Sequence, residues 1–225
     1  LPHLAGGPDF DIIVAEKWGA QGLEEHKKTR RQQAEETKRH IFEVALALLD
    51  RRAFEQIKVR DIVEAAQVSV GTFYNYYATK LDVYYETYQL ADEYFEDVVA
   101  PALIQPTARE RILYFFDEYA RYSSEITDIS LTKLLYNSNN KCFDRPSEQG
   151  IRRVLGEQVQ QGLQAGEFHS EEGAAAMVDF LMIAARGLVY NWCTHDGGYP
   201  IRPAMKRYVA VSYTHLRAHE TLRHL

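Results

Sequence analysis

Two short helical patterns separated by a break, within residues 58–80, constrain the fold of this chain more than any other stretch. In the first pattern Ile62 and Ala65 are three residues apart, so that one face of the helix is apolar. In the second pattern Phe73 and Tyr77 are four residues apart and share one stripe. Two short helices with a tight turn and an apolar inner face predict a helix-turn-helix, whose second helix can lie in the DNA major groove.

The residues of this stretch form a longer motif, which reads Val59-Arg60-Asp61-Ile62, Ala65-Ala66, Val68-Ser69, Gly71-Thr72-Phe73-Tyr74, Tyr76-Tyr77 and Lys80. In this order and spacing it resembles the DNA-binding signature of the TetR/AcrR (tetracycline-repressor-like) transcriptional regulators. One position departs from the family pattern, because Gln67 stands where the family usually has Gly, at a helix C-terminus that favours a left-handed backbone. A side chain there costs about 1 kcal/mol, so we expect a strained turn that still forms.

The resemblance implies an all-α fold with two parts. An N-terminal three-helix domain would carry the helix-turn-helix, and a larger C-terminal helical domain would bind a ligand and form a dimer. We expect a mobile extension over residues 1–30, the helix-turn-helix DNA-binding domain over 31–80, and the helical effector-binding and dimerisation domain over 81–211. Residues 212–225 do not continue the preceding helical pattern cleanly, and we treat them as a tail of doubtful origin.

Physical chemistry gives several residues of the motif a role at DNA. Ser69 is a good N-cap, and the first-turn N–H groups of the helix that it opens suit a phosphate oxygen. Asn75 can pair with adenine and Arg60 with guanine through two hydrogen bonds each, and such a pair discriminates by roughly 1–3 kcal/mol. The plainer alternative for Arg60 is a solvated pair with Glu64, four residues further on.

The resemblance assigns further residues to the DNA contact. Positions that face bases or the nearby backbone, in the helix that Ser69 opens and in the one before it, are Arg60, Val70, Gly71, Thr72, Asn75 and Tyr76. Positions that match phosphate contacts are Tyr74 and Lys80, with Lys58 standing where the family often has Thr. The alternative for Tyr76 is packing between the helices, which is the role that we expect for Tyr77.

Charge is divided unevenly along the chain, whose formal net charge is −6. Residues 26–80 hold 11 Lys and Arg against 7 Asp and Glu, a charge of +4, whereas the remainder holds 15 against 25, a charge of −10. A basic end on an acidic body fits a protein whose one end meets phosphate. The charged segment 24–36 is either a solvated helix entry or an arm that contacts phosphates or the minor groove.

Other classes of protein find little support in the sequence. Cys142 and Cys193 have no CxxC spacing, so neither a disulfide framework nor a zinc site is indicated. His215 and His219 have a spacing that could bind a metal on a helix, but they lack a third ligand, and we expect no metal and no cofactor. No GxSxG, P-loop or HExxH motif occurs, so we do not expect an enzyme. There is no apolar run of about 18 residues and no signal-peptide layout, which predicts a cytoplasmic protein without a membrane span.

Helical periodicity continues through the rest of the chain. We expect helices over residues 34–52, 81–100, 108–122, 127–137, 147–165 and 171–197, and a last helix after Pro200. Pro101 and Pro106 should end the second of these, since proline cannot continue a helix interior. Gly166 is a plausible C′ residue of the fifth.

The helix expected over residues 171–197 is apolar around much of its circumference and rich in small residues. With the helix after Pro200 it is the best candidate for a two-fold four-helix interface, an arrangement that the family uses. The alternative is an ordinary core helix. The expected interface residues are Ala174, Met177, Val178, Leu181, Ala185, Leu188 and Tyr208.

Aromatic residues are frequent in the segment downstream of the motif. Most of them should pack in the core, and the resemblance implies that some line a largely apolar cavity for a small effector. The candidates are Phe95, Phe115, Phe116, Tyr119, Tyr122, Phe180 and Trp192.

These observations predict a sequence-specific DNA-binding transcriptional regulator, a repressor that a small-molecule effector releases from its operator. Double-stranded DNA with a palindromic operator would hold two heads of a homodimer on half-sites about 34–36 Å apart or a multiple of it. The alternative is a helical regulator or adaptor that binds protein without binding DNA. The intact motif residues Thr72, Tyr74 and Lys80 favour the first hypothesis.

Overall fold

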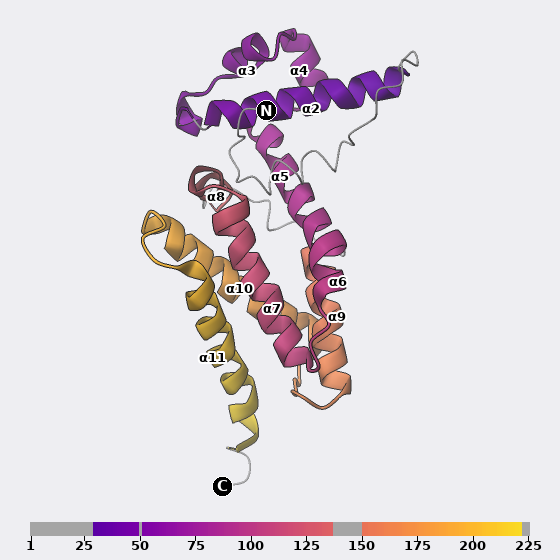
Figure 1. Cartoon of the computed structure of the whole chain (residues 1–225), viewed down its shortest axis with the longest axis vertical. Helices are drawn as coiled ribbons and strands as arrows, with labels where there is room; N and C mark the ends of the chain where they lie inside the picture. The colour runs from indigo at the N-terminus through magenta and orange to yellow at the C-terminus, as the bar shows by residue number, and fades with distance from the viewer. Residues whose placement is uncertain (1–28, 50, 137–149, 222–225) are drawn as a thin grey trace. The chain divides into compact units, whose positions relative to one another are not determined.

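The structure, a computed structural model, describes residues 29–49, 51–136 and 150–221, and the side chains as far as Val211 (Figure 1). Within these residues the regular elements are all helices, as the sequence predicted. They form two compact units, of which the first holds the described residues up to Leu90 together with Glu125–Leu135. The second unit holds Ala91–Ser124 and the described residues after Leu135. The first unit therefore extends past Lys80, where the sequence placed the functional boundary, and that boundary stays a prediction.

The first unit is an assembly of short helices around the long helix α2. Its elements are α2 (Arg30–Leu49), a 3-10 turn η1 (Phe54–Gln56), α3 (Val59–Ala65), α4 (Val70–Tyr76), most of α5 (Lys80–Tyr94) and α8 (Ile129–Leu135). The helix α2 begins before the expected start at residue 34, and one apolar stripe of it is buried. The fully buried residues of that stripe are Ile41, Phe42, Ala45 and Leu46.

Polar contacts fix α5 against α2 within this unit. The buried Tyr84 hydroxyl donates to the Ala45 carbonyl over 3.0 Å. Lys38 Nζ lies 2.5 Å from the buried carboxylate of Glu86, and the Tyr77 hydroxyl donates to the Lys38 carbonyl over 3.3 Å. The first two contacts join α5 to α2, and the third joins the residue after α4 to α2. Because the Tyr84 hydroxyl and the Glu86 carboxylate are buried, their partners are needed to offset desolvation.

The turn between α3 and α4 has the left-handed residue that the sequence predicted. Gln67 has φ 54°, and the N–H groups around it close a Schellman motif. The Val68 N–H donates to the Val63 carbonyl over 3.0 Å, and the Gln67 N–H donates to the Glu64 carbonyl over 3.3 Å. The expected strained turn is confirmed, since a non-glycine residue occupies a conformation that costs L-residues on the order of 1–2 kcal/mol.

The second unit contains the longer helices of the chain. Its elements are the end of α5, a π-helical turn η2 (Phe95–Val99), α6 (Ala100–Ala102), α7 (Ala108–Arg121), most of a second π-helical turn η3 (Tyr122–Ile126), α9 (Ile151–Gln164), α10 (Gly173–Thr194) and α11 (Ile201–Thr221). The helices α7 and α10 each pack against both α9 and α11. A capping box opens α7, in which Thr107 and Glu110 satisfy each other's backbone N–H groups. Gly166, with φ 69°, follows α9 as predicted.

Two helix ends differ from the sequence-based expectation. Pro101 does not end the helix at residue 100, because it lies within the short helix α6, which ends at Ala102. The preceding π-helical turn separates it from α5. At the other end of the chain, α11 continues through Ser212 to Thr221, although the apolar pattern fades after Val211. The side chains of His215 and His219 lie outside the described ones.

The helix α10 is long and apolar enough, by length and composition, to cross a membrane. A core helix of a soluble protein passes the same test, and one whole face of α10 is packed inside the second unit. Asp179 and Arg186 interrupt its apolar sequence, and charges are costly inside a bilayer. The helix is therefore no clear membrane span.

Candidate nucleic-acid interface

The helix α4 has one buried and one exposed face. Phe73 is fully buried and Tyr77, which follows the helix, is 3% exposed. The opposite face presents Val70, Tyr74 and Asn75, and the exposed fractions of Val70 and Tyr74 are 51% and 54%. A short helix that is anchored by two aromatic rings and bears exposed polar and apolar groups is suited to enter a groove of DNA.

The start of α4 is capped by its own residues. The Ser69 hydroxyl accepts a hydrogen bond from the Thr72 N–H over 2.9 Å and lies 2.8 Å from the Thr72 hydroxyl. Ser69 therefore has the predicted capping role, and these two hydroxyls already bond each other. The N–H groups of Val70 and Gly71 donate to no group in the described residues and remain available for a phosphate oxygen. A methyl group at Gly71 would lie 3.6 Å from the Ser69 hydroxyl oxygen, so the protein itself does not require glycine there.

The helix α3 presents Arg60 and Glu64 on its exposed side. Arg60 Nε donates to Glu64 Oε1 over 2.8 Å, and the two side chains are 83% and 62% exposed. The predicted surface pair is thus present, and it leaves the terminal nitrogens of Arg60 accessible. At the start of α3 the Lys58 side chain is exposed, while its N–H donates to Asp61 Oδ2 over 2.7 Å. This hydrogen bond is the main cause of the lowered pKa of Asp61.

Lys80 has a structural role that the sequence did not suggest. Its Nζ donates to the carbonyls of Phe54 and Ile57, over 2.6 Å each, and lies 3.7 Å from the centre of the Phe54 ring. Partial burial lowers its pKa, and the charges of Glu55 and Asp61 oppose this. An ammonium has three donors, so one remains for the predicted phosphate contact. These hydrogen bonds could not be predicted from the sequence motif, because their acceptors are backbone carbonyls, which every residue has.

The tyrosines of the motif are placed differently from one another. Tyr74 is exposed and packs the edge of its ring on Phe73, with 5.4 Å between the ring centres. Tyr76 is half-buried. Tyr77 packs between helices, as predicted, and burial strongly raises the pKa of its hydroxyl. Tyr74 is therefore the tyrosine whose hydroxyl is best placed for a DNA phosphate.

Five of the seven aromatic residues proposed from the sequence for an effector site gather in the core of the second unit. Ring centres are 4.9 Å apart for Phe95 and Phe115, 5.1 Å for Phe115 and Phe116, and 6.1 Å for Phe95 and Tyr119. Tyr122 completes this aromatic cluster, 6.4 Å from Phe95. Each of the five is at most 7% exposed.

The other two candidates lie elsewhere. Phe180 is 47% exposed on α10, so the structure does not support it as a core residue. Trp192 is buried, but its indole N–H donates to the Tyr199 carbonyl over 2.9 Å in the connection between α10 and α11. Its position is explained by this connection, because a buried indole N–H needs an acceptor.

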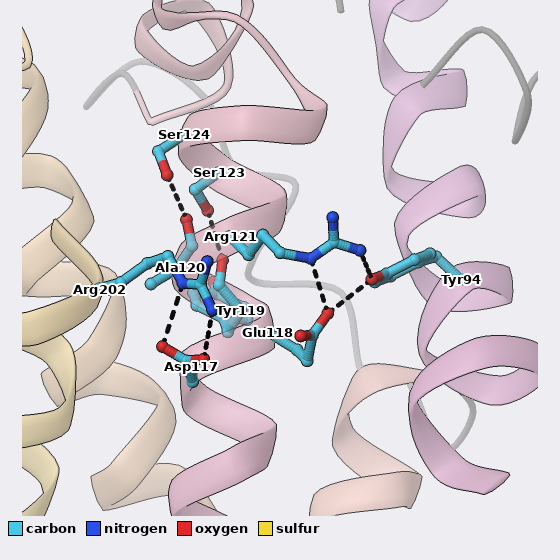
Figure 2. Close-up of polar contacts among 9 residues, drawn as sticks. All are labelled: Tyr94, Asp117, Glu118, Tyr119, Ala120, Arg121, Ser123, Ser124 and Arg202. Atoms are coloured by element: carbon cyan, nitrogen blue, oxygen red, sulfur yellow. Dashed lines mark hydrogen bonds and ion pairs between the residues drawn. The ribbon is translucent and has the colours of Figure 1, made fainter. Parts of the chain in front are cut away.

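Hydrogen bonds join the buried Tyr94 and Glu118 to the half-buried Arg121 beside the aromatic cluster, and Figure 2 shows these three residues. The Tyr94 hydroxyl donates to Glu118 Oε2 over 2.7 Å, and Arg121 Nε donates to the same oxygen over 3.0 Å. A terminal nitrogen of Arg121 donates to the Tyr94 hydroxyl over 2.6 Å. The Tyr94 ring lies 5.2 Å from the Tyr122 ring. Polar and aromatic groups thus meet at the end of α5.

A second ion pair in the same view holds α11 to α7. Arg202 Nε donates to Asp117 Oδ1 over 3.2 Å, and a terminal nitrogen of Arg202 donates to Asp117 Oδ2 over 2.6 Å (Figure 2). Beside it, Ser123 and Ser124 donate their hydroxyls to the carbonyls four residues earlier, where α7 changes into the π-helical turn (Figure 2). These contacts lie in the C-terminal half of α7 and just after it, and the same half carries Phe115, Phe116 and Tyr119 of the aromatic cluster.

Most of the dimer-interface residues expected from the sequence belong instead to the core of one chain. Ala174 and Leu188 are half-buried, and Tyr208 is 51% exposed. Those with at most 5% of their surface exposed are Met177, Val178, Leu181 and Ala185. These four residues are covered by the chain itself, because α10 is apolar on both sides and its sequence does not mark which side the rest of the chain covers. The dimer interface stays a prediction.

A different face of α10 is both apolar and exposed. We call it the outer stripe, and it consists of Ala176, Phe180, Ile183, Gly187 and Tyr190. Their spacing of four and three residues places them within about 80° of one another around the helix. Ile183 is 68% exposed, and among the described residues nothing beyond the neighbours of Gly187 and the backbone of its own helix lies within 4 Å of where its Cβ would be. The adjoining helix α11 exposes Tyr208 and Val211.

The described residues contain no cluster of three or more His, Cys, Asp or Glu that could hold a metal ion. Cys193 is buried and forms no disulfide. Cys142 lies outside the described residues. What the first unit does show is a capped second helix, anchored by aromatic rings and preceded by a tight turn, and this arrangement defines a helix-turn-helix DNA-binding domain.

Comparison with known proteins agrees with this class. The model of the family described as bacterial regulatory proteins, tetR family, matches residues 41–86, which include α3 and α4. The match covers the helix-turn-helix and its flanking helices, so this part of the chain is similar to the DNA-binding domain of that family. Among curated proteins none matches the sequence.

Solved structures share the fold over most of this chain. FadR from Bacillus subtilis in complex with stearoyl-CoA is 15% identical, with 77% of this chain and 96% of that chain covered and a TM-score of 0.57. FadR from Thermus thermophilus in complex with lauroyl-CoA is 21% identical, with 77% and 92% covered and a TM-score of 0.58. The MbdR regulator from Azoarcus sp. CIB is 19% identical, with 79% and 97% covered and a TM-score of 0.53. At these identities the similarity establishes the fold.

Proposed function

We propose that this protein is a sequence-specific, cytoplasmic transcriptional repressor whose helix-turn-helix reads a DNA operator. The observation that carries the proposal is the exposed face of α4 in a domain of the tetR family, opposite the buried rings of Phe73 and Tyr77. Asn75 and the terminal nitrogens of Arg60 offer the donors and acceptors that read base edges. Tyr74 and the N–H groups of Val70 and Gly71 suit phosphate oxygens and set the register.

The proposed active form is a homodimer on two half-sites of a palindromic operator. One helix-turn-helix contacts few base pairs, so useful specificity requires a second copy at a fixed spacing. The outer stripe of α10 supports this, because its seven-residue periodicity and its small residues Ala176 and Gly187 suit close packing against an identical helix. Exposed Tyr208 and Val211 extend the apolar surface onto α11.

We further propose that a small effector binds in the second unit and releases the operator. Support comes from the aromatic cluster, which offers apolar surface, and from Tyr94, Glu118 and Arg121, which offer polar groups at its border. The similar FadR structures hold stearoyl-CoA and lauroyl-CoA, and acyl-CoA is therefore the first class of ligand to consider. Such a ligand lowers operator affinity only by its preference for the conformation that does not fit DNA.

Gel shifts on duplexes selected by the protein, over a series of salt concentrations, test this function. Affinity should fall steeply with salt, as release of counterions requires. Tyr74→Ala should weaken binding to every duplex by about tenfold, since it removes a bond to a charged phosphate. Asn75→Ala should instead lose discrimination of roughly 1–3 kcal/mol at one base pair. Equal effects of both substitutions on all duplexes, or binding that is insensitive to salt, would contradict the proposal. Lauroyl-CoA added to the same complex tests the effector.

A further inference from the structure

Glu64 is an acidic residue on the surface that we propose faces DNA. Residues 58–80 contain two acidic side chains, Asp61 and Glu64. Asp61 has a structural role, because it accepts the Lys58 N–H over 2.7 Å and lies 3.5 Å from Arg52. Glu64 is 62% exposed, and in the described structure its carboxylate bonds only Arg60.

Stability does not explain an acidic group in this place. An exposed ion pair between side chains four residues apart contributes little to folding, because both groups remain well solvated. On the other hand, a carboxylate near DNA is repelled by the phosphates, so Glu64 opposes the general attraction that the basic residues provide. Its effect must be sought in what it does to Arg60.

The geometry of the pair limits how Arg60 can be used. Glu64 Oε1 accepts from Nε of Arg60 over 2.8 Å, and the two terminal nitrogens have no partner among the described residues. The guanidinium is planar, so a bond at Nε fixes the direction of the remaining fork. Two parallel N–H groups of that fork match O6 and N7 of guanine. An arginine without this restraint could equally turn to a phosphate, which carries no sequence information.

We propose that Glu64 is a positioning residue, which holds Arg60 for guanine in the major groove and so converts a general cation into a base reader. This inference rests on the proposed DNA-binding function. It predicts that the restraint and the charge of Glu64 act in opposite directions. The hydrogen-bond acceptor increases discrimination at one base pair, and the negative charge decreases affinity for all duplexes.

Two substitutions separate these effects. Glu64→Gln keeps an acceptor for Arg60 Nε and removes the charge, whereas Glu64→Ala removes both. Both should bind random duplex a few-fold more tightly at low salt, because one repulsive charge is gone. Only Glu64→Ala should lose discrimination, by about tenfold, at a single base pair. Glu64 is 62% exposed, so the thermal unfolding midpoints of both variants should stay close to that of the unchanged protein.

Arg60→Ala identifies the base pair and serves as the reference. Binding of all four base pairs at each operator position is measured for Arg60→Ala, for Glu64→Ala and for the double variant. If Glu64 acts through Arg60, Glu64→Ala adds nothing to the loss in the Arg60→Ala background, because the effects of coupled residues do not add.

The outcomes distinguish the inference from the function on which it rests. An unchanged protein that prefers no sequence contradicts the proposed function itself. If it does prefer a sequence, the inference is overturned when Glu64→Ala keeps full discrimination at the Arg60 base pair, when it sharpens that discrimination, or when Glu64→Gln loses as much as Glu64→Ala. The inference is also overturned when Arg60→Ala alters the discrimination among base pairs at no operator position.

Discussion

Gln67 shows how much one residue of this chain could be predicted. The family pattern has glycine at its position, so the sequence alone predicted a left-handed backbone that a side chain would strain, and the residue has φ 54°. The turn forms nevertheless, because the Schellman hydrogen bonds and the burial of Ile62 and Phe73 on either side outweigh a local cost of about 1 kcal/mol.

Gln67→Gly should therefore stabilise the first unit. Glycine relieves the left-handed strain but gains freedom in the unfolded chain, so we expect a net increase of about 0.5–1 kcal/mol in the free energy of unfolding. Denaturant unfolding monitored by circular dichroism measures it. Gln67→Ala is the matched control and should bring no gain, since alanine meets the same strain. A Gly variant no more stable than the Ala variant would contradict the prediction, because it would show that the entropy of glycine offsets the relief of strain.

Lys80 makes contacts that its place in the sequence motif did not predict. The sequence assigned it to phosphate from its place in the pattern, and the structure adds bonds to the carbonyls of Phe54 and Ile57. These acceptors are backbone groups 26 and 23 residues earlier in the chain. No side-chain type marks them, so only the fold brings them to the ammonium. The phosphate contact of Lys80 stays a prediction.

At the scale of elements, hydrophobic periodicity predicted where the helices are, but it did not predict which face of each helix packs against the others. The helix α2 buries one apolar stripe, and polar residues mark its other side. The helix α10 is apolar on both sides, and the expected interface residues Met177 and Leu181 proved to lie in the core. Which side meets the rest of the chain depends on α9 and α11, and their packing cannot be read from the sequence of α10 alone.

Ile183→Glu should separate the proposed dimer, because it places a charge at the centre of the outer stripe. Sedimentation should show a monomer, and affinity for an operator with two half-sites should fall on the order of a hundredfold as the second head is lost. Ile104→Glu is the matched control, since Ile104 is 84% exposed and lies outside the stripe. A dimer that survives Ile183→Glu, or that Ile104→Glu also separates, would place the interface elsewhere.

At the scale of the whole molecule, charge and fold divide the chain in a similar way. The basic residues 26–80 lie largely in the first unit, which carries the helix-turn-helix. The acidic remainder includes the aromatic cluster and the outer stripe of α10. We expect the basic segment to be attracted by DNA phosphates and the acidic remainder to be repelled by them.

Local sequence spacing predicts the DNA-binding motif but not the contacts between helices that are distant in the sequence. The class of the DNA-binding head followed from its motif, because short-range spacing encodes it. The polar groups around Tyr94 and Glu118 did not, since they are joined by contacts between helices that are distant in the sequence. An effector that separates these groups would act on α5, the helix that runs from Lys80 in the first unit to Tyr94 in the second.

We propose that two copies of this chain read one operator. Selection of bound duplexes from a random library at physiological salt, followed by sequencing, tests this proposal. We expect an inverted repeat whose half-sites are centred about 34–36 Å apart along the duplex, or a multiple of that spacing. Enrichment of no sequence, or of a single half-site without a repeat, would contradict it.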